Sequence, residues 1–313
     1  MTVKVSILGL GKMGANHLRT LSLLKTADIQ YIFDYDEGAL KKLSDEFNVP
    51  YTMDLNEAIK GCDAVYIVTP TSTHFEYFKK CSPKVKNIFI EKPLTASYEE
   101  GLELQKISEK NNNFIQCGFV ERFNPAFQSL TNLVKDQKII NIDFTRTNKL
   151  SSRITDVDVI LDLMIHDIDL ALNLNGSVKE VFSFGAYEND QIAFCNAILK
   201  HHNGAISRLL ASRMTEKKIR SIEVTATNNF IEAELLKKTL IVHKQSEIIE
   251  DQGKDYQINS MQQEIEVGFQ EALLTENQVF INNCISQSDI EIPDLKSSIQ
   301  VLRIAKEITT LLI

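Results

Sequence analysis

The sequence predicts two domains: an α/β domain with a doubly wound parallel sheet, then an α+β domain with a mostly antiparallel, open sheet. Three observations predict this fold. The chain has 313 residues, more than one typical domain. From Val3 to about Val120, short apolar runs rich in Val, Ile and Phe alternate with segments of helical periodicity, as in parallel sheets with crossover helices. After Pro125 extended runs predominate, which is typical of an α+β domain.

The first domain is predicted over residues 1–120 from five buried strands and the helices between them. The expected strands are VKVSILG, IQYIFD, AVYIVT, NIFIEK and FIQCGF. The expected helices place apolar residues mostly three or four apart, as helices that cover a sheet require. These segments are HLRTLSLL, GALKKLSDEF, LNEAIK, THFEYFKKC and YEEGLELQKISEK.

The second domain is predicted over residues 121–313. Its expected helices are FQSLTNLVK and VILDLMIHDIDLALNL, and its expected strands are KIINIDFTRT, VKEVFSFGAY, QIAFCNAILKH, AISRLLASR and RSIEVTATN. Helical spacing after Pro293 predicts a terminal helix over 295–313 that docks on the body of the protein. We interpret His17 as a structural residue of the first helix, and His201 and His202 as structural residues before a hairpin turn.

The overall composition argues against several classes of function. A net charge of −8 is unfavourable for a protein that binds nucleic acid through the phosphate backbone. The five cysteines are dispersed and odd in number, as expected for reduced thiols in the cytoplasm. Glycines interrupt the first apolar stretch, which is also too short to span a membrane, so we expect neither an export signal nor a membrane helix.

A glycine-rich turn follows the first predicted strand. Gly9-Leu10-Gly11-Lys12-Met13-Gly14 ends that strand and opens the first helix. Glycines there permit a tight turn and close backbone approach, and the helix N–H groups face a bound pyrophosphate. The motif alone is weak, since a glycine turn without a ligand has the same sequence, but its position after a strand favours a dinucleotide site.

Asp34 ends the second predicted strand, where a carboxylate can accept hydrogen bonds from the ribose of an adenosine. The same charge would repel a 2′-phosphate, and the following Tyr35 and Asp36 supply no cation to neutralise one. The sequence therefore predicts NAD as the cofactor, in preference to NADP.

Glu91-Lys92-Pro93 directly follows the predicted strand NIFI. Ligands bind at the carboxyl ends of strands in open α/β sheets, so we expect Lys92 to face the cofactor crevice. The alternative is a charged surface turn, because proline ends strands and both charges are usually solvated.

A helical segment in the second domain carries the third candidate group. Asp162, His166 and Asp169 are spaced i, i+4 and i+7, so a regular helix presents them on one face. A carboxylate beside a histidine suits general acid–base chemistry on a hydroxyl. The alternatives are a helix-start aspartate with a structural histidine, or a metal site; we predict no metal, because no further Cys or His cluster has ligand spacing.

Five motifs in order identify the chain as similar to the Gfo/Idh/MocA oxidoreductase family over its whole length. They are GLGKMG, TPTSTH from Thr69 to His74, EKP from Glu91, GFVERFNP from Gly118 and IHDIDL from Ile165. The resemblance implies that NAD is bound by the glycine loop, Asp34, Thr69, Pro70, Thr71, His74, Glu91 and Lys92. It further implies proton transfer by Lys92 and His166, with Asp162 assisting and helping to bind substrate.

The segment RITDVDVILDLMIHDIDLAL, followed by SRMTEKKIR, resembles the nucleotide-sugar 3-dehydrogenases that act on UDP-N-acetylglucosamine. A diphosphate needs cations, which the second domain could supply, although exposed basic residues are common and need have no such role. The candidates are Arg146, Lys149, Arg153, Arg213 and Lys217, of which Arg153 is placed with Lys92, Asp162 and His166 in the expected substrate site.

The predicted activity is oxidation of a secondary hydroxyl of a sugar, most specifically C3 of a UDP-N-acetyl amino sugar, to a ketosugar. One alternative is a dehydrogenase of a cyclitol such as myo-inositol, or of a free sugar. Another is a noncatalytic NAD-binding sensor or scaffold. The family resemblance also implies a homo-oligomer, a dimer or tetramer, formed through the outer face of the second sheet.

Overall fold

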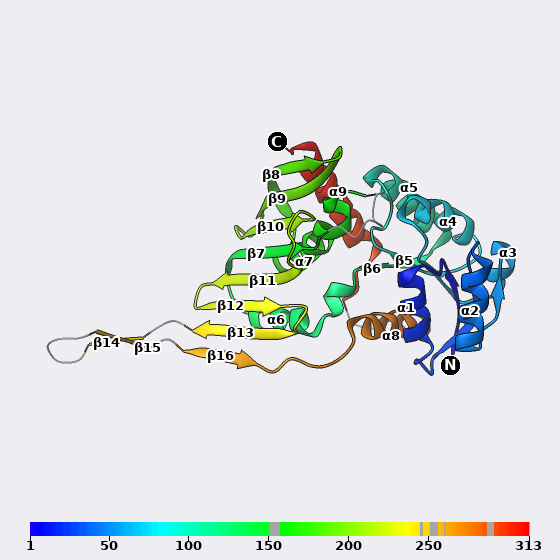
Figure 1. Cartoon of the computed structure of the whole chain (residues 1–313), viewed down its shortest axis with the longest axis horizontal. Coiled ribbons are helices and arrows are strands. Elements are labelled where there is room, and N and C mark those ends of the chain that lie inside the picture. The colour runs from blue at the N-terminus through cyan, green and yellow to red at the C-terminus, as the bar shows by residue number, and fades with distance from the viewer. Residues whose placement is uncertain (150–156, 245–246, 251–255, 260, 287–290, 313) are drawn as a thin grey trace. The chain divides into compact units, whose positions relative to one another are not determined.

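The computed structural model describes residues 1–149, 157–244, 247–250, 256–259, 261–286 and 291–312 (Figure 1). The chain divides into two compact units. Unit 1 comprises Met1–Phe123 and Glu271–Arg303, and unit 2 comprises Asn124–Gln270 and Ile304–Ile313. The sequence interpretation placed all of 121–313 in the second domain, whereas the structure groups Glu271–Arg303 with the first.

Unit 1 contains a parallel sheet of six strands in the order β3-β2-β1-β4-β5-β6. The order reverses beside β1, so crossover helices lie on both faces, and the predicted doubly wound α/β fold is confirmed. The two-residue strand β3 was not predicted because it is too short to show a pattern. The strands are β1 (Val3–Leu8), β2 (Ala27–Phe33), β3 (Tyr51–Thr52), β4 (Ala64–Ile67), β5 (Asn87–Glu91) and β6 (Phe114–Gly118).

Side chains cap the starts of several helices of unit 1. Asp36 accepts hydrogen bonds from the N–H groups of Gly38 and Ala39 at the start of α2, and Asn48 ends that helix in the left-handed conformation. The helices are α1 (Lys12–Leu21), α2 (Glu37–Phe47), α3 (Leu55–Ala58), α4 (His74–Cys81), α5 (Tyr98–Asn111) and α8 (Ala272–Ile285), with the short 3₁₀ turns η1 (Thr71–Thr73) and η2 (Val120–Phe123). The predicted terminal helix is α9 (Leu295–Thr310), and the boundary between the units falls within it.

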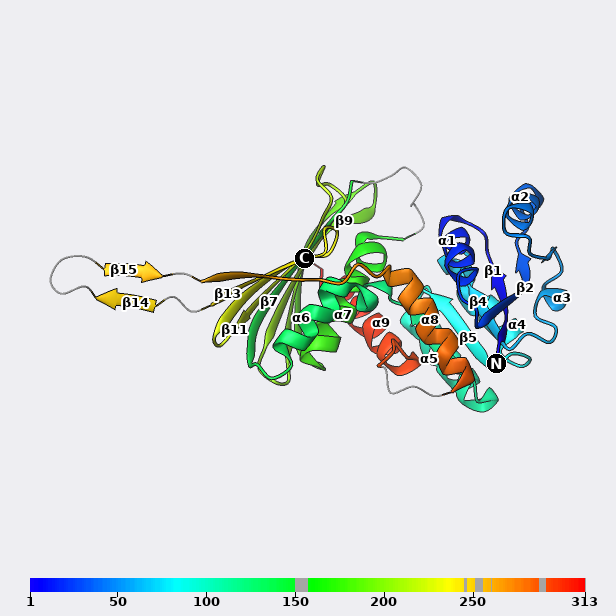
Figure 2. The same cartoon turned by 90° about the horizontal axis from the view of Figure 1, so that it is seen from below.

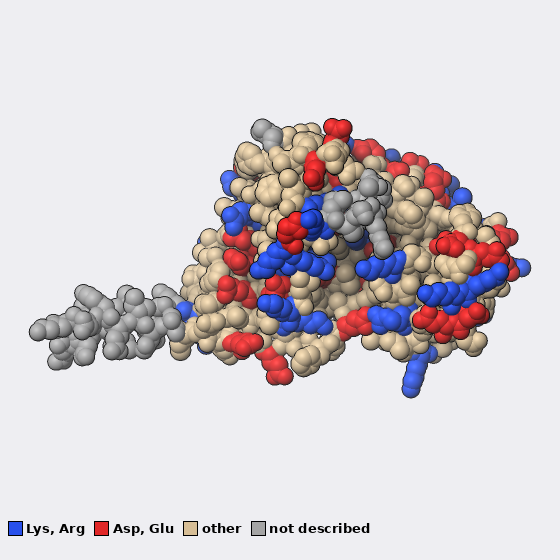
Figure 3. Space-filling model, viewed as in Figure 1, with Lys and Arg blue, Asp and Glu red and all other residues tan. Residues whose placement is uncertain are grey.

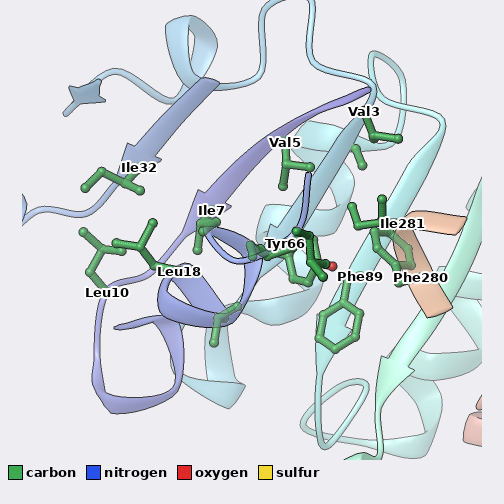
Figure 4. Packing of buried hydrophobic residues seen from close by; sticks show 14 of the residues in the cluster. Val3, Val5, Ile7, Leu10, Leu18, Ile32, Tyr66, Phe89, Phe280 and Ile281 are labelled. Carbon is green, nitrogen blue, oxygen red and sulfur yellow. The ribbon is translucent and has the colours of Figure 1, made fainter. Parts of the chain in front are cut away.

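The core on one face of this sheet joins segments from both ends of the sequence. Ile7, Tyr66 and Phe89 project from adjacent strands and pack with Phe280 and Ile281 of α8 (Figure 4). Tyr66 and Phe89 stack at 4.7 Å, and Phe280 meets both rings edge-on. Helix α8 thus supplies cover that the crossover helices leave incomplete, which explains why Glu271–Arg303 belongs to unit 1.

Unit 2 is built on a sheet of eight strands in the order β16-β13-β12-β11-β7-β10-β9-β8. β7 and β10 pair in parallel and the other neighbours are antiparallel, so the predicted mostly antiparallel sheet is confirmed. Its strands are β7 (Ile139–Thr147), β8 (Val178–Glu188), β9 (Gln191–His201), β10 (Ile206–Ser212), β11 (Ile219–Ala226), β12 (Asn229–Glu234), β13 (Thr239–Lys244) and β16 (Gln262–Ile265). β14 (Glu247–Glu250) and β15 (Tyr256–Asn259) form a separate antiparallel pair.

Helices cover one face of the unit 2 sheet. α6 (Pro125–Val134) and α7 (Ile165–Asn175) lie on the same side of it in Figure 2, and α7 follows directly on the π-helical turn η3 (Ile160–Met164). On the opposite face, Phe182 and Phe184 of β8 and Ile206 of β10 are exposed. The sheet is therefore open on one side, as predicted.

Charged side chains of both signs are interspersed on the face shown in Figure 3. Within the described ranges, no helix combines the length and apolar character needed to cross a bilayer.

Candidate active site

The glycine turn of unit 1 is shaped by two close backbone approaches. Gly9 has φ +93°, and a Cβ atom there would lie 2.7 Å from the carbonyl oxygen of Val68. A Cβ on Gly14 would lie 1.9 Å from the carbonyl oxygen of Gly9. Both distances are far below van der Waals contact, so these two positions require glycine. The turn is consequently folded tightly against the end of β4.

Gly11 differs, because a Cβ there would meet nothing within 4 Å. Gly11 is the N-cap of α1 and provides no side-chain cap, and the first turn of this ten-residue helix carries no acidic residue. The helix N–H groups are thus available for an anion, and the missing side chain leaves room for it. Lys12 and Met13 are exposed at the same helix start. These features fit the pyrophosphate of a dinucleotide.

Asp34 lies where β2 ends, as predicted, and its carboxylate is held by the backbone around it. One oxygen accepts the N–H of Leu10 at 2.6 Å, and the other accepts the N–H groups of Tyr35 and Asp36 at 2.7 and 3.0 Å. Asp34 therefore connects the glycine turn to the end of β2. Its side chain is half-buried, so part of it remains open to a ribose.

The segment TPTSTH follows β4, the strand next to β1 in the sheet. Thr69 adjoins Gly9, whereas His74 is only 1% exposed. The two ring nitrogens of His74 face the carbonyl oxygens of Pro93 and Thr69, at 2.9 and 2.8 Å. Burial lowers the pKa of His74, and the neutral ring donates to one carbonyl at a time. The buried ring fixes the loop, and the expectation that His74 lines the cofactor crevice stays a prediction.

Glu91 is the last residue of β5, the next strand along, and Lys92 follows it. Glu91 is buried, and one oxygen of its carboxylate lies 2.9 Å from Nε2 of His17 while the other accepts the N–H of Lys92 at 2.9 Å. Both oxygens are engaged inside the unit, and the contact of Glu91 with the cofactor stays a prediction. Lys92 is half-buried and precedes a cis peptide bond to Pro93.

The loops after β1, β4 and β5 come from three neighbouring strands, so the glycine turn, Thr69-Pro70-Thr71 and Lys92 lie along one edge of the sheet. This edge is formed by the carboxyl ends of parallel strands. The structure thus brings together the predicted cofactor residues of unit 1, apart from the inward-facing side chains of His74 and Glu91.

Asp162 and His166 belong to unit 2, where Asp162 lies within the π-helical turn η3 and His166 in the first turn of α7. Both are half-buried, whereas Asp169 is buried. The carboxylate of Asp162 forms a 2.9 Å ion pair with Arg213, which also donates to the carbonyl oxygens of Val157 and Asp158. The sequence predicted a regular helix here. A single π turn inside an α-helix often occurs at a functional site, and the spacing of apolar residues does not reveal it.

The predicted cations of unit 2 are mostly engaged with carboxylates of the protein. Arg146 is 1% exposed and forms a bidentate pair with Asp167 at 2.8–3.0 Å. Arg213 is buried and pairs with Asp162, and Lys149 pairs with Glu216 at the surface. Arg146 and Arg213, two of the candidate cations for a diphosphate, are therefore buried and paired with carboxylates of the protein. Lys217 is exposed, and Arg153 lies outside the described residues.

Sequence reasoning missed Arg213 as the partner of Asp162, since the two residues are 51 positions apart and only the packing of η3 beside β10 brings them together. It also treated His17 as an ordinary helix residue, although His17 contacts Glu91. Across the described ranges, no group of three or more His, Cys, Asp or Glu side chains is arranged to hold a metal ion.

Two family models match the chain, in the order of the two units. Residues 3–119 match the oxidoreductase family with an NAD-binding Rossmann fold, and residues 140–232 match the GFO/IDH/MocA C-terminal domain. The chain belongs to the Gfo/Idh/MocA oxidoreductase family. The resemblance expected from the motifs is therefore confirmed, and with it an NAD-binding oxidoreductase.

Individual relatives of this Gfo/Idh/MocA member include enzymes of two substrate types. The chain is 27% identical over 243 residues to a UDP-N-acetylglucosamine 3-dehydrogenase of Acidithiobacillus ferrooxidans, covering 77% of each chain. It is 25% identical over 300 residues to a myo-inositol 2-dehydrogenase of Thermotoga maritima, covering 90% of this chain and 88% of that one. A solved structure of the Acidithiobacillus enzyme has a TM-score of 0.90 at 23% identity, covering 100% and 98% of the two chains, and so shares the fold.

Proposed function

We propose that this oxidoreductase is an NAD-dependent dehydrogenase that oxidises a secondary hydroxyl of a sugar to a ketone. The observation that carries the proposal is the position of Lys92 at the carboxyl end of β5, on the same sheet edge as the glycine turn. A lysine there can polarise the oxygen of the substrate while the carbinol hydrogen faces the cofactor.

Each residue of the cofactor site has a distinct part in this proposal. The turn from Gly9 to Gly14 holds the pyrophosphate at the start of α1, Asp34 holds the adenosine ribose, and Thr69-Pro70-Thr71 lies beside the nicotinamide. The dinucleotide, when bound, supplies the hydride acceptor. NAD is favoured over NADP because Asp34 carries a negative charge and the following residues, Tyr35 and Asp36, carry no positive one.

We assign the proton of the substrate hydroxyl to His166 or Lys92. Hydride leaves the carbon with the electron pair of its C–H bond, and the O–H proton leaves to a base, so a carbon–oxygen double bond forms. Asp162 helps to hold the substrate and the histidine, and its ion pair with Arg213 fixes the position of its carboxylate.

The substrate we favour is a UDP-N-acetyl amino sugar oxidised at C3. The support is the similarity to the UDP-N-acetylglucosamine 3-dehydrogenase, to which the chain can be aligned over 77% of its length. The second candidate is a cyclitol, supported by the similarity to the myo-inositol 2-dehydrogenase. The engagement of Arg146 and Arg213 with internal carboxylates leaves fewer cations for a diphosphate. Lys149 and Lys217 are exposed, and Lys149 pairs with Glu216.

NADH absorbance distinguishes these substrates. Purified protein is incubated with NAD and with UDP-N-acetylglucosamine, UDP-N-acetylgalactosamine, UDP-glucose or myo-inositol, and inhibition by UDP is measured in parallel. We expect NADH to form with a UDP-sugar and UDP to compete with it. NADH formed only with myo-inositol would establish the cyclitol alternative. NAD binding without any turnover would favour the sensor or scaffold.

We also propose that copies of this chain associate through the open face of the unit 2 sheet. Phe182 and Phe184 are 51% and 53% exposed on β8, and Ile206 is 41% exposed on β10. Such neighbouring apolar side chains favour burial against a second copy. Replacing Phe182 and Phe184 together by Ser should lower the molar mass measured by light scattering to that of the monomer. A double variant with the same mass as the wild-type protein would contradict the proposal.

A further inference from the structure

A buried polar network lies beneath Glu91-Lys92-Pro93 in unit 1. His17 of α1 is 0% exposed, and its ring connects two residues that are distant in sequence. Nε2 lies 2.9 Å from Oε1 of Glu91, and Nδ1 lies 3.0 Å from Oδ1 of Asn277 on α8. Three segments of the chain therefore meet at one imidazole.

The hydrogen bonds determine where the protons of this network lie. The amide nitrogen of Asn277 donates to Oγ1 of Thr20 at 2.7 Å, so its oxygen accepts from His17 and Nδ1 carries a proton. The imidazole and the Glu91 carboxyl group then share one further proton between Nε2 and Oε1. The pair is neutral overall whichever atom carries that proton, so it can be buried without an uncompensated charge.

Glu91 connects His17 to the backbone of Lys92. Its second oxygen accepts the main-chain N–H of Lys92 at 2.9 Å. A Cβ on Gly118 would lie 2.9 Å from the carboxyl carbon of Glu91, so the glycine on β6 makes room for the group. Both oxygens of Glu91 are therefore held, and the peptide that carries Lys92 has a fixed position.

Aromatic rings prevent the histidine from turning. The imidazole meets Phe89 edge-on at 5.0 Å and Tyr66 at 5.4 Å, and both rings belong to the buried cluster of Figure 4. On the far side of Lys92, the ring of His74 faces the carbonyl oxygen of Pro93 at 2.9 Å. Lys92 thus stands between two residues, Glu91 and Pro93, each of which a buried histidine holds.

We propose that His17 is a positioning residue for Lys92, acting through the carboxylate of Glu91. The inference rests on the proposed function, in which Lys92 meets the reacting hydroxyl. A displacement of about 1 Å at a reacting group can lower a rate about 100-fold. His17, which is connected to Lys92 by two hydrogen bonds through Glu91, can therefore affect turnover without touching the substrate.

The test compares His17→Leu with a matched variant in unit 2. His201 is also buried, and its ring nitrogens also make two hydrogen bonds, to the carbonyl oxygen of Gly176 and to Oγ of Ser207. We expect both His17→Leu and His201→Leu to lower the thermal midpoint. Only His17→Leu should lower kcat, by about 100-fold, with the dissociation constant of NADH unchanged in fluorescence titrations. Equal kcat values in the two variants would overturn the proposal.

Glu91 provides a second comparison that does not depend on the folding of His17→Leu. In Glu91→Gln, the amide nitrogen can donate to unprotonated Nε2 of His17 while the amide oxygen accepts the N–H of Lys92. Glu91→Ala makes neither bond. We expect Glu91→Gln to recover most of the kcat that Glu91→Ala loses. A glutamine variant as slow as the alanine variant would contradict the positioning role.

A readout without turnover separates this inference from the proposed function. Lysines are dimethylated with ¹³C-formaldehyde, and the NMR signal of Lys92 is identified by its absence in Lys92→Arg. We expect that signal to move in His17→Leu and to stay in place in His201→Leu. If it moves while the wild-type protein oxidises no substrate, the positioning role stands and the proposed function fails. An unmoved signal refutes the positioning role even in an active enzyme.

Discussion

The buried side chain of Arg213 forms an ion pair of 2.9 Å with the half-buried carboxylate of Asp162, the side chain that we assign to substrate binding. The guanidinium also donates to two main-chain carbonyl oxygens of the segment that leads into the π turn. Removing one partner of a buried pair leaves the other charge uncompensated, at a cost of about 3–5 kcal/mol. Arg213 therefore holds both the carboxylate of Asp162 and the backbone segment that leads to it.

Arg213→Met should consequently lower both stability and activity. We expect a loss of about 3 kcal/mol in the free energy of unfolding, measured with urea. Arg146→Met provides the matched control, because Arg146 pairs with Asp167 in the same unit and is equally buried. Its stability should fall by a similar amount, while KM for the sugar should rise only in the Arg213 variant. A KM raised equally in both would contradict the role of Arg213.

The glycine turn predicts opposite outcomes for two substitutions of the same kind. Gly11→Ala adds a methyl group that meets nothing within 4 Å, so the thermal midpoint should not change. The methyl group would occupy space next to the pyrophosphate, so NAD affinity should fall at least about tenfold, which corresponds to about 1.4 kcal/mol. Gly14→Ala places its methyl group 1.9 Å from a carbonyl oxygen and should destabilise unit 1. Calorimetry measures the thermal midpoint of each variant, and NADH fluorescence measures its affinity for the cofactor. Binding of the cofactor by Gly11→Ala as tightly as by the wild type would argue against the predicted site.

Asp34 should determine the choice of cofactor. Asp34→Ser removes the charge that would repel a 2′-phosphate and keeps a hydroxyl that can accept a backbone hydrogen bond. We expect the ratio of kcat/KM for NAD to that for NADP to fall, mainly through a weaker affinity for NAD. The dissociation constants of NADH and NADPH, measured by fluorescence, check the expected direction. An unchanged ratio would show that Asp34 does not contact the ribose.

The pKa of His201 gives the protein a predictable response to acid. Burial lowers this pKa below its ordinary value of 6.5, so the unfolded chain binds a proton that the folded chain does not. The stabilising effect of the neutral ring is therefore present above pH 6.5 and is lost as the pH falls towards the lowered pKa. The thermal midpoint of the wild type should fall, relative to that of His201→Gln, between pH 7 and pH 5. Thermal midpoints that change equally with pH in the wild type and in His201→Gln would refute the lowered pKa of His201.

The local features of the fold were predictable because local chemistry determines them. The parallel strands, the glycine turn and the hairpin between β9 and β10 each depend on residues close in sequence. Helix α8 was not predicted, because its buried Glu276 and Asn277 interrupt the apolar stripe that indicates a core helix. Its position on the Rossmann sheet depends on contacts with residues more than 200 positions away, such as Tyr66.

The same distinction applies to the candidate site. Asp34 and Lys92 follow strands directly, so the strand pattern predicts their edge of the sheet. The internal roles of His17, Glu91 and His74 follow from hydrogen bonds between distant segments, which no local pattern reports. The ion pairs of Arg146 and Arg213 are of this kind too. A sequence shows that a residue is charged, but not which residue neutralises it.

Isotope transfer tests the central claim most directly. UDP-N-acetylglucosamine carrying deuterium at C3 is incubated with the protein and NAD, and the NADH is analysed by mass spectrometry. We predict that the NADH gains one deuterium from C3-labelled substrate and none from substrate labelled at C4. Deuterium from C4, or NADH that forms only with myo-inositol, would contradict oxidation of the UDP-amino sugar at C3.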